Sequence, residues 1–67
     1  MLNESKNNDV MLKAAALAER WSTSTGRLAN MRCAGTGPAF MKIGESVRYR
    51  LCDVEDYERA NTVAPIA

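Results

Sequence analysis

Apolar residues recur at helical spacing near the start of the chain. The segment 13–21 is rich in strong helix formers and places four apolar side chains on one helical face: Ala14, Leu17, Ala18 and Trp21. Residues 10–12, which are also apolar, are expected to pack beneath this helix. A polar run, 22–26, then ends it.

A second short helix is predicted over residues 25–33. Ser24 suits its N-cap position, because a serine hydroxyl there accepts a hydrogen bond from an otherwise unpaired amide of the first turn. Leu28 and Met31 recur at a spacing that directs both side chains inward. The glycine- and proline-containing cluster 34–38 ends this helix. The predicted domain therefore contains two short helices joined by a polar turn.

After this cluster the pattern changes to an alternation with a period of two, which predicts a β-hairpin over residues 38–50. Its tight turn lies at 44–46, where Gly44 can adopt a positive φ. The residues predicted to face the core are Phe40, Val47 and Tyr49. The residues predicted to face outward are Arg48 and Arg50.

A third helix is predicted over residues 52–60, with Val54 and Tyr57 facing inward. Acidic residues in its first turn suit the positive end of the helix dipole. The order helix–helix–β-hairpin–helix predicts a small α+β fold with the layout of a winged helix-turn-helix. We expect the domain to span residues 11–60, preceded by a mobile polar arm, 1–10, and followed by a flexible tail, 61–67.

The size of the chain and its lack of histidine limit the chemistry available to it. With 67 residues, the domain is near the lower limit for an independent core, so neither a deep active-site cleft nor a small-molecule cavity is expected. The two cysteines, Cys33 and Cys52, cannot supply the four ligands of structural zinc and are expected to act as small apolar residues. We therefore predict that the protein is not an enzyme and uses no metal or cofactor.

Positive charge is concentrated in the middle of the chain, although the net charge is only +1. Residues 20–50 carry six arginine or lysine side chains and a single acidic one, Glu45, which gives +5. Residues 1–19 sum to −1 and residues 51–67 to −3. Such segregation is typical of a protein that binds nucleic acid, since a merely solvated surface usually mixes the two signs.

The predicted DNA contacts lie on the second helix and on the hairpin, or wing. In a helix-turn-helix the N-terminal residues of the second helix enter the major groove, where arginine pairs with guanine and asparagine with adenine. The predicted recognition-helix contacts are Ser24, Thr25, Arg27, Asn30 and Arg32. The predicted wing contacts are Lys42, Arg48 and Arg50. Each of these residues alone is also an ordinary surface residue, so the combination carries the prediction.

From Leu12 to Arg59 the chain resembles the excisionase and AlpA-like regulator family, small MerR-like winged-helix proteins of phages and integrated elements. The matching residues are Leu17-Ala18, Trp21, Ser24, Leu28, Gly35, Gly37-Pro38, Phe40, Lys42, Gly44, Val47-Arg48-Tyr49-Arg50, Asp53-Val54-Glu55 and Tyr57. The chain departs from the family pattern at Ser22, where the turn usually has a glycine, and at Cys52, where a capping serine or threonine is common. Glu45, at the hairpin turn, opposes deep insertion of the wing.

The resemblance implies a sequence-specific accessory protein that binds double-stranded DNA. As an excisionase, or recombination directionality factor, it would bend DNA to direct an integrase; as an AlpA-like member it would regulate transcription. Further copies of the chain along the DNA are also implied partners. The alternative is a protein-interaction module that binds a polymerase, a repressor or an integrase through the acidic last helix and the tail 63–66.

The N-terminal segment lacks the basic and apolar regions of a signal peptide. No run approaches the roughly 20 apolar residues of a membrane span. We therefore expect a cytoplasmic protein with no membrane partner, and the resemblance places it in a bacterial host cell, associated with the nucleoid.

Overall fold

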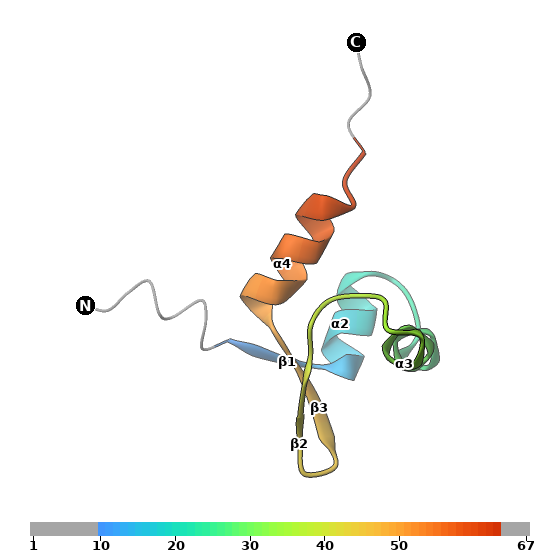
Figure 1. Ribbon diagram of the computed structural model, residues 1–67, viewed down its shortest axis with the longest axis vertical. Helices are drawn as coiled ribbons and strands as arrows, with labels where there is room; N and C mark the ends of the chain where they lie inside the picture. The colour runs from blue at the N-terminus through green and yellow to red at the C-terminus, as the bar shows by residue number, and fades with distance from the viewer. Residues whose placement is uncertain (1–9, 64–67) are drawn as a thin grey trace, which may run out of the picture.

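The computed structural model of the chain describes residues 10–63 and shows a small α+β fold with three helices and a three-stranded antiparallel sheet (Figure 1). The elements are β1 (Met11–Lys13), α2 (Ala14–Arg20), α3 (Thr25–Ala34), β2 (Met41–Ile43), β3 (Ser46–Arg50) and α4 (Leu51–Ala60). The α+β class predicted from the sequence is confirmed. Apart from Val10 and residues 61–63, the predicted arm and tail lie outside the described residues.

The three helices differ from the predicted ones by one residue at some ends, because the signals that end a helix act locally. At the start of α3, the Ser24 Oγ accepts a hydrogen bond from the Arg27 amide at 3.1 Å, so the predicted N-cap is confirmed. The helix ends at Gly35, whose φ of +76° stops it in the left-handed conformation. None of the helices in the described part of the chain is long and apolar enough to cross a bilayer.

The sheet has one strand more than the predicted hairpin. β1 pairs with β3 in antiparallel register, with Leu12 opposite Tyr49, and makes the strand order β1-β3-β2. Residues 10–12 were expected only to pack beneath the first helix. Instead, the Leu51 amide donates a hydrogen bond to the Val10 carbonyl at 3.0 Å, which extends the β1 pairing by one residue. β3 is therefore the central strand.

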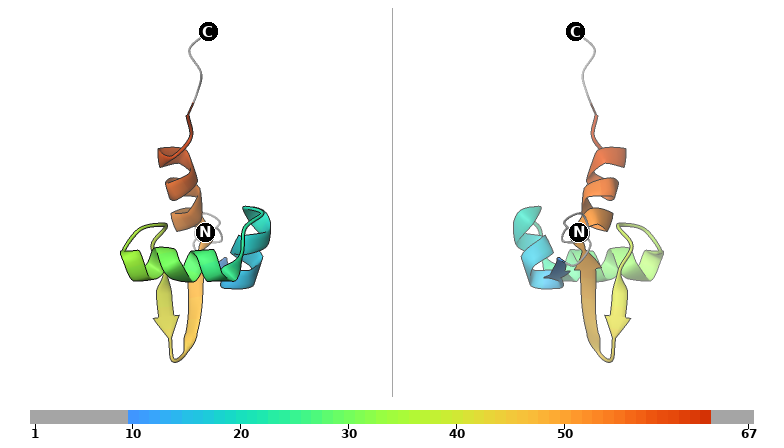
Figure 2. Two further views of the ribbon diagram at one scale, coloured as in Figure 1. Left: turned by 90° about the vertical axis from the view of Figure 1, so that its right-hand side faces the viewer. Right: turned by 90° about the vertical axis from the view of Figure 1, so that its left-hand side faces the viewer.

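The core lies where α2, α3 and α4 meet the inner face of β3. Five buried hydrophobic side chains form it: Leu17, Ala18, Leu28, Tyr49 and Val54. The left view of Figure 2 shows α3 crossing in front of the sheet, and both views show α4 rising away from the sheet and the hairpin extending below α3. Phe40 was predicted to face the core but is 42% exposed. It lies in the link before β2 and contacts only the edge of the core, with its ring centroid 6.3 Å from that of Tyr49.

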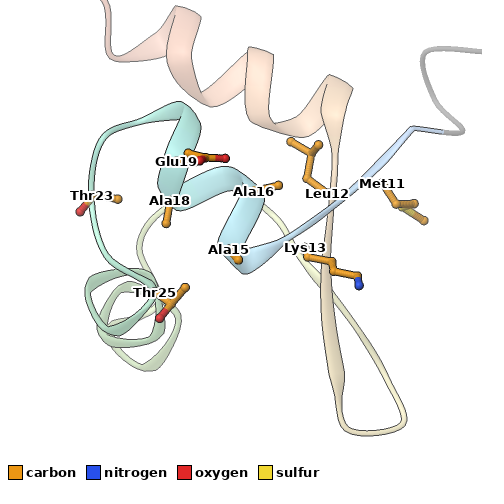
Figure 3. A pocket seen from close by; sticks show the side chains of 9 residues that line it. All are labelled: Met11, Leu12, Lys13, Ala15, Ala16, Ala18, Glu19, Thr23 and Thr25. Atoms are coloured by element: carbon orange, nitrogen blue, oxygen red, sulfur yellow. The ribbon is translucent and has the colours of Figure 1, made fainter.

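Alternation along the strands divides the sheet into two faces. Leu12, Val47 and Tyr49 pack against the helices, so their neighbours in sequence, including Arg48 and Lys13, belong to the opposite, outer face. The register places those two cationic residues directly opposite each other. In Figure 3 the side chain of Lys13 extends away from α3. The outer face is thus separated from the helices by the sheet itself.

The turn between α2 and α3 contains a backbone conformation that glycine adopts more easily than serine. Ser22 has φ of +56°, and it is the only non-glycine residue with positive φ among residues 10–63. The Thr23 amide donates to the Ala18 carbonyl at 2.8 Å and closes the turn. Glycine would suit position 22 better than serine, since a left-handed L-residue costs about 1 kcal/mol or more.

We expect Ser22→Gly to stabilise the protein. Relief of the left-handed strain exceeds the added flexibility of the unfolded chain, so the net gain is about 0.5 kcal/mol and the melting temperature rises by about 2–4 °C. Thermal unfolding followed by circular dichroism measures this rise. Thr23→Gly is the matched control at a position without positive φ and is expected to lower the melting temperature. A fall with Ser22→Gly would contradict the prediction.

Candidate nucleic-acid interface

The solvent-exposed side of α3 is polar and carries no acidic side chain. Leu28 is buried beneath the helix, whereas Thr25, Arg27 and Asn30 are exposed. An open groove of about 750 Å³ follows this side. Its lining residues are Ser24, Gly26, Arg27, Asn30, Met31, Ala34 and Thr36. The structure therefore brings three of the predicted recognition-helix residues, Ser24, Arg27 and Asn30, to one surface.

The N-terminus of α3 uses Ser24 first as a cap. Its hydroxyl oxygen accepts from the Arg27 amide, and its carbonyl accepts from the Leu28 amide at 3.2 Å. The hydroxyl proton is not used in this cap and can donate a hydrogen bond to a ligand. Thr25 lies on the other flank, beside a shallow hollow of about 670 Å³ that is lined by alanines of α2, Lys13 and Glu19 (Figure 3). Charges of both signs border this hollow, and nothing in it indicates a particular ligand.

Arg32, predicted as a DNA contact, is turned toward the sheet. Its Nη1 donates a hydrogen bond to the Tyr49 hydroxyl at 2.6 Å. The guanidinium carbon lies 5.7 Å from the centroid of the Phe40 ring and 6.0 Å from that of Tyr49. These distances are within the range of cation–π contacts. The side chain of Arg32 is therefore held by the hairpin rather than extended beside Arg27.

A cleft of about 330 Å³ lies between α3 and the hairpin. It is lined by Ala29, Arg32, Cys33, Phe40, Lys42 and Val47. Lys42 pairs with Val47 in the register and so lies on the inner face of the sheet, on the same side as α3. Among residues 10–63 it takes part in no ion pair. Cys33, which was expected to act as a small apolar residue, is an exposed free thiol here.

Arg48 and Arg50, the two other predicted wing contacts, lie on the outer face of the sheet. Arg48 donates from Nη1 to the carbonyl of its neighbour Val47 at 2.9 Å. The Nε of Arg50 lies 3.6 Å from the Oδ2 of Asp53, which is in the first turn of α4. Both point outward as predicted, but the outward direction is away from α3. The predicted wing set is thus divided, and among its three residues only Lys42 lies on the same side of the sheet as α3.

Gly26 was not among the predicted site residues. It lies in the first turn of α3 with no positive φ, and a Cβ built there would meet nothing nearer than the Ser24 Oγ at 3.9 Å. A glycine inside a helix costs about 1 kcal/mol relative to alanine, and neither backbone nor packing in the described residues requires one here. Close approach of a ligand does favour glycine. The sequence feature that could have pointed to Gly26 as a site residue is a glycine within a predicted helix.

The end of α2 is fixed to α4 by Glu58. Arg20 donates from Nε and Nη2 to the two carboxylate oxygens at 2.6 and 2.9 Å, and the Trp21 indole donates to Oε2 at 2.6 Å. These hydrogen bonds lower the pKa of Glu58 to about 2. Arg20, counted in the basic segment, is therefore neutralised by α4. Two further acidic residues of α4 are also in ion pairs, Asp53 with Arg50 and Asp56 with Arg59.

We expect acid to destabilise the protein partly through Glu58. Because its folded-state pKa is lowered from 4.5 to about 2, its stabilising contribution is complete above pH 4.5 and is lost as the pH falls toward 2. Melting temperatures between pH 7 and pH 2 are expected to fall less steeply for Glu58→Gln than for the wild type, from a lower value at pH 7. Asp56→Asn, in the exposed pair with Arg59, is the control. Parallel curves for wild type and Glu58→Gln would contradict this role.

Comparison with known proteins adds no relative that could identify the chain. The sequence matches no family model and no curated protein. What the molecule does must therefore be inferred from α3, the hairpin and the residues that they present.

Proposed function

We propose that this protein is a sequence-specific accessory factor that binds double-stranded DNA as a winged helix-turn-helix. In this proposal α3 is the recognition helix and the β2–β3 hairpin is the wing. The observation that carries the proposal is the exposed side of α3, which presents Arg27 and Asn30 with no acidic side chain on the helix and with Lys42 on the adjacent strand.

The dimensions and chemistry of α3 suit the major groove. A ten-residue helix is about 15 Å long, and the groove admits a helix because it is about 12 Å wide. Arg27 can donate two hydrogen bonds to guanine, and Asn30, one turn later, can pair with adenine. Gly26 lets a phosphate or a base edge approach the first turn closely. These residues together would read the sequence.

The wing would position the protein rather than read bases. Lys42, on the α3 side of the hairpin, is placed to contact a phosphate beside the groove that α3 enters. Glu45 at the turn opposes deep insertion into the minor groove. We assign Arg48 and Arg50, which lie on the outer face of the sheet, no contact with the DNA that α3 binds. The resemblance to excisionases and AlpA-like regulators supplies the role, either bending DNA for an integrase or controlling a promoter.

A protein-interaction module remains the second candidate, but the acidic helix supports it less than the sequence suggested. Asp53, Asp56 and Glu58 are each held in an ion pair within the chain. Their charge is therefore balanced locally, and Glu55 is the one acidic residue of α4 outside these pairs. A partner that recognises negative charge would find little of it on α4.

The test is selection of binding sites from a random double-stranded DNA pool, followed by titration of the enriched sequence at several salt concentrations. We expect one enriched motif and an affinity that falls by about tenfold or more between 50 and 200 mM salt, as two or more phosphate contacts require. Absence of any enriched sequence at low salt, or binding insensitive to salt, would overturn the proposal.

Gly26→Ala is expected to separate stability from function. The added methyl group has space in the free protein and raises helix propensity, which stabilises the fold by about 0.5–1 kcal/mol. At the DNA surface the same group prevents close approach, and the affinity is expected to fall about tenfold, or about 1.4 kcal/mol. Thermal unfolding and fluorescence anisotropy on one preparation measure both effects. A stabilised variant that binds DNA as tightly as the wild type would show that Gly26 does not lie in the DNA interface.

A further inference from the structure

We infer that Arg32 is a positioning residue, which holds the wing at a fixed angle to the recognition helix through Tyr49 and Phe40 and does not contact DNA itself. The inference rests on the proposed function and deepens it. Arg32 was predicted to contact DNA because it lies on α3. The contacts of its side chain indicate instead that it positions the hairpin.

Arg32 connects three parts of the chain that the interface requires. The residue itself is in α3, Phe40 is in the link before β2, and Tyr49 is in β3. The guanidinium donates to the Tyr49 hydroxyl at 2.6 Å and lies over both aromatic rings. The two rings are themselves in tilted contact, with centroids 6.3 Å apart. One cation thereby joins the recognition helix to both ends of the hairpin.

This connection is the one side-chain hydrogen bond between α3 and the hairpin within residues 10–63. The turn of the hairpin extends past the helices (Figure 2), so the direction of the wing is set at its base, where Arg32 lies. A small change of angle at the base moves the distal end of the hairpin, and with it the neighbouring Lys42, relative to Arg27.

Turning the Arg32 side chain away from the hairpin, toward a phosphate beside Arg27, would break a bond that the fold needs. The ring of Tyr49 is buried, and every buried polar side-chain atom in the described residues has a partner. Withdrawal of the guanidinium would remove the bonded partner of the Tyr49 hydroxyl and leave that group unsatisfied, which is unfavourable. The planar guanidinium also suits two rings and a directed hydrogen bond in a way that a lysine ammonium does not.

The experiment compares DNA affinity for Arg32→Lys, Tyr49→Phe and the double variant, at a temperature where circular dichroism shows all of them folded. We expect each single variant to weaken binding by about fivefold and the double variant to weaken it no further, since both remove one link. Arg59→Lys, on the exposed side of α4, is the control and should bind normally. Retained affinity in Arg32→Lys, or in Tyr49→Phe, would overturn the inference.

Salt dependence gives a second test. Measured in a Lys42→Ala background, where the wing has already lost its proposed phosphate contact, Arg32→Gln removes the charge and should leave the slope of log affinity against log salt unchanged, whereas loss of a true phosphate contact at Arg32 lowers that slope by about 1. A lowered slope would overturn the inference.

A measurement without DNA separates this inference from the proposed function. Residual dipolar couplings report the orientation of the β2–β3 amides relative to those of α3, and we expect this orientation to differ between the wild type and both Arg32→Lys and Tyr49→Phe. If the wild type binds no DNA, the proposed function fails, and the couplings still decide whether Arg32 sets the angle of the hairpin. An unchanged orientation in both variants would overturn the inference.

Discussion

Leu17→Ala is expected to leave most of the chain unfolded at 25 °C. Leu17 is 0% exposed and is one of only five buried residues in the core. A core of this size stabilises a small domain by about 3–5 kcal/mol. Truncation of a buried leucine to alanine costs about 2–5 kcal/mol, because the transfer free energy of the lost atoms and the cavity that they leave add together. One substitution therefore removes most or all of the stability.

Far-UV circular dichroism and urea titration measure this loss. The matched control is Ile43→Ala, which removes a similar apolar group from a side chain that is 59% exposed. We expect this control to change the free energy of unfolding by no more than about 0.5 kcal/mol. A cooperative urea transition for Leu17→Ala close to that of the wild type would show that the core extends beyond the five residues.

Arg27→Ala is expected to abolish most sequence-specific DNA binding while leaving the fold intact. Arg27 is exposed on α3 and forms no ion pair within the described part of the chain, so its removal leaves no unsatisfied partner. A bidentate contact of arginine with guanine is worth about 1–3 kcal/mol, which corresponds to about 5- to 150-fold in affinity. Discrimination at one base pair should be lost together with the affinity.

The control for Arg27 is Arg59→Ala. It removes the same charge from an exposed arginine of α4, whose partner is the exposed Asp56, and it lies outside the proposed interface. Fluorescence anisotropy with the selected DNA and with a single-base variant of it separates affinity from specificity. Equal losses for Arg27→Ala and Arg59→Ala would mean that binding follows net charge and that α3 does not read the sequence.

Sequence patterns predicted the helices within about one residue because their signals are local. The spacing of Leu17 and Trp21 and the cap at Ser24 require no knowledge of the rest of the chain. β1 was missed for the opposite reason. Its three residues, Met11–Lys13, do not alternate between apolar and polar types, although their burial does. Its partner, β3, lies at the other end of the domain, so no local sequence pattern indicates that the two strands pair.

At the candidate site, too, the sequence pattern predicted which way a side chain points but not which parts of the protein lie around it. Alternation correctly placed Arg48 and Arg50 on the face of the sheet away from the core. No pattern in the strand reveals that α3, the helix with the other predicted contacts, lies on the other face of the sheet. Alternation also gives direction without depth, which is why Phe40 was expected to be buried. Arg32 lies on α3 as predicted, yet its bond to the Tyr49 hydroxyl depends on a tertiary contact that helical spacing does not encode.

The pairing of β1 with β3 also affects how the chain folds during synthesis. Met11 is added to the growing chain almost 40 residues before its partner Arg50, which is roughly 2–8 s at about 5–20 residues per second. Through that interval β1 is an edge strand without a partner, and such edges favour pairing between chains. The native sheet therefore forms only after the chain has been translated as far as Arg50. A helical hairpin, whose two helices are neighbours in sequence, can form as soon as its second helix is made.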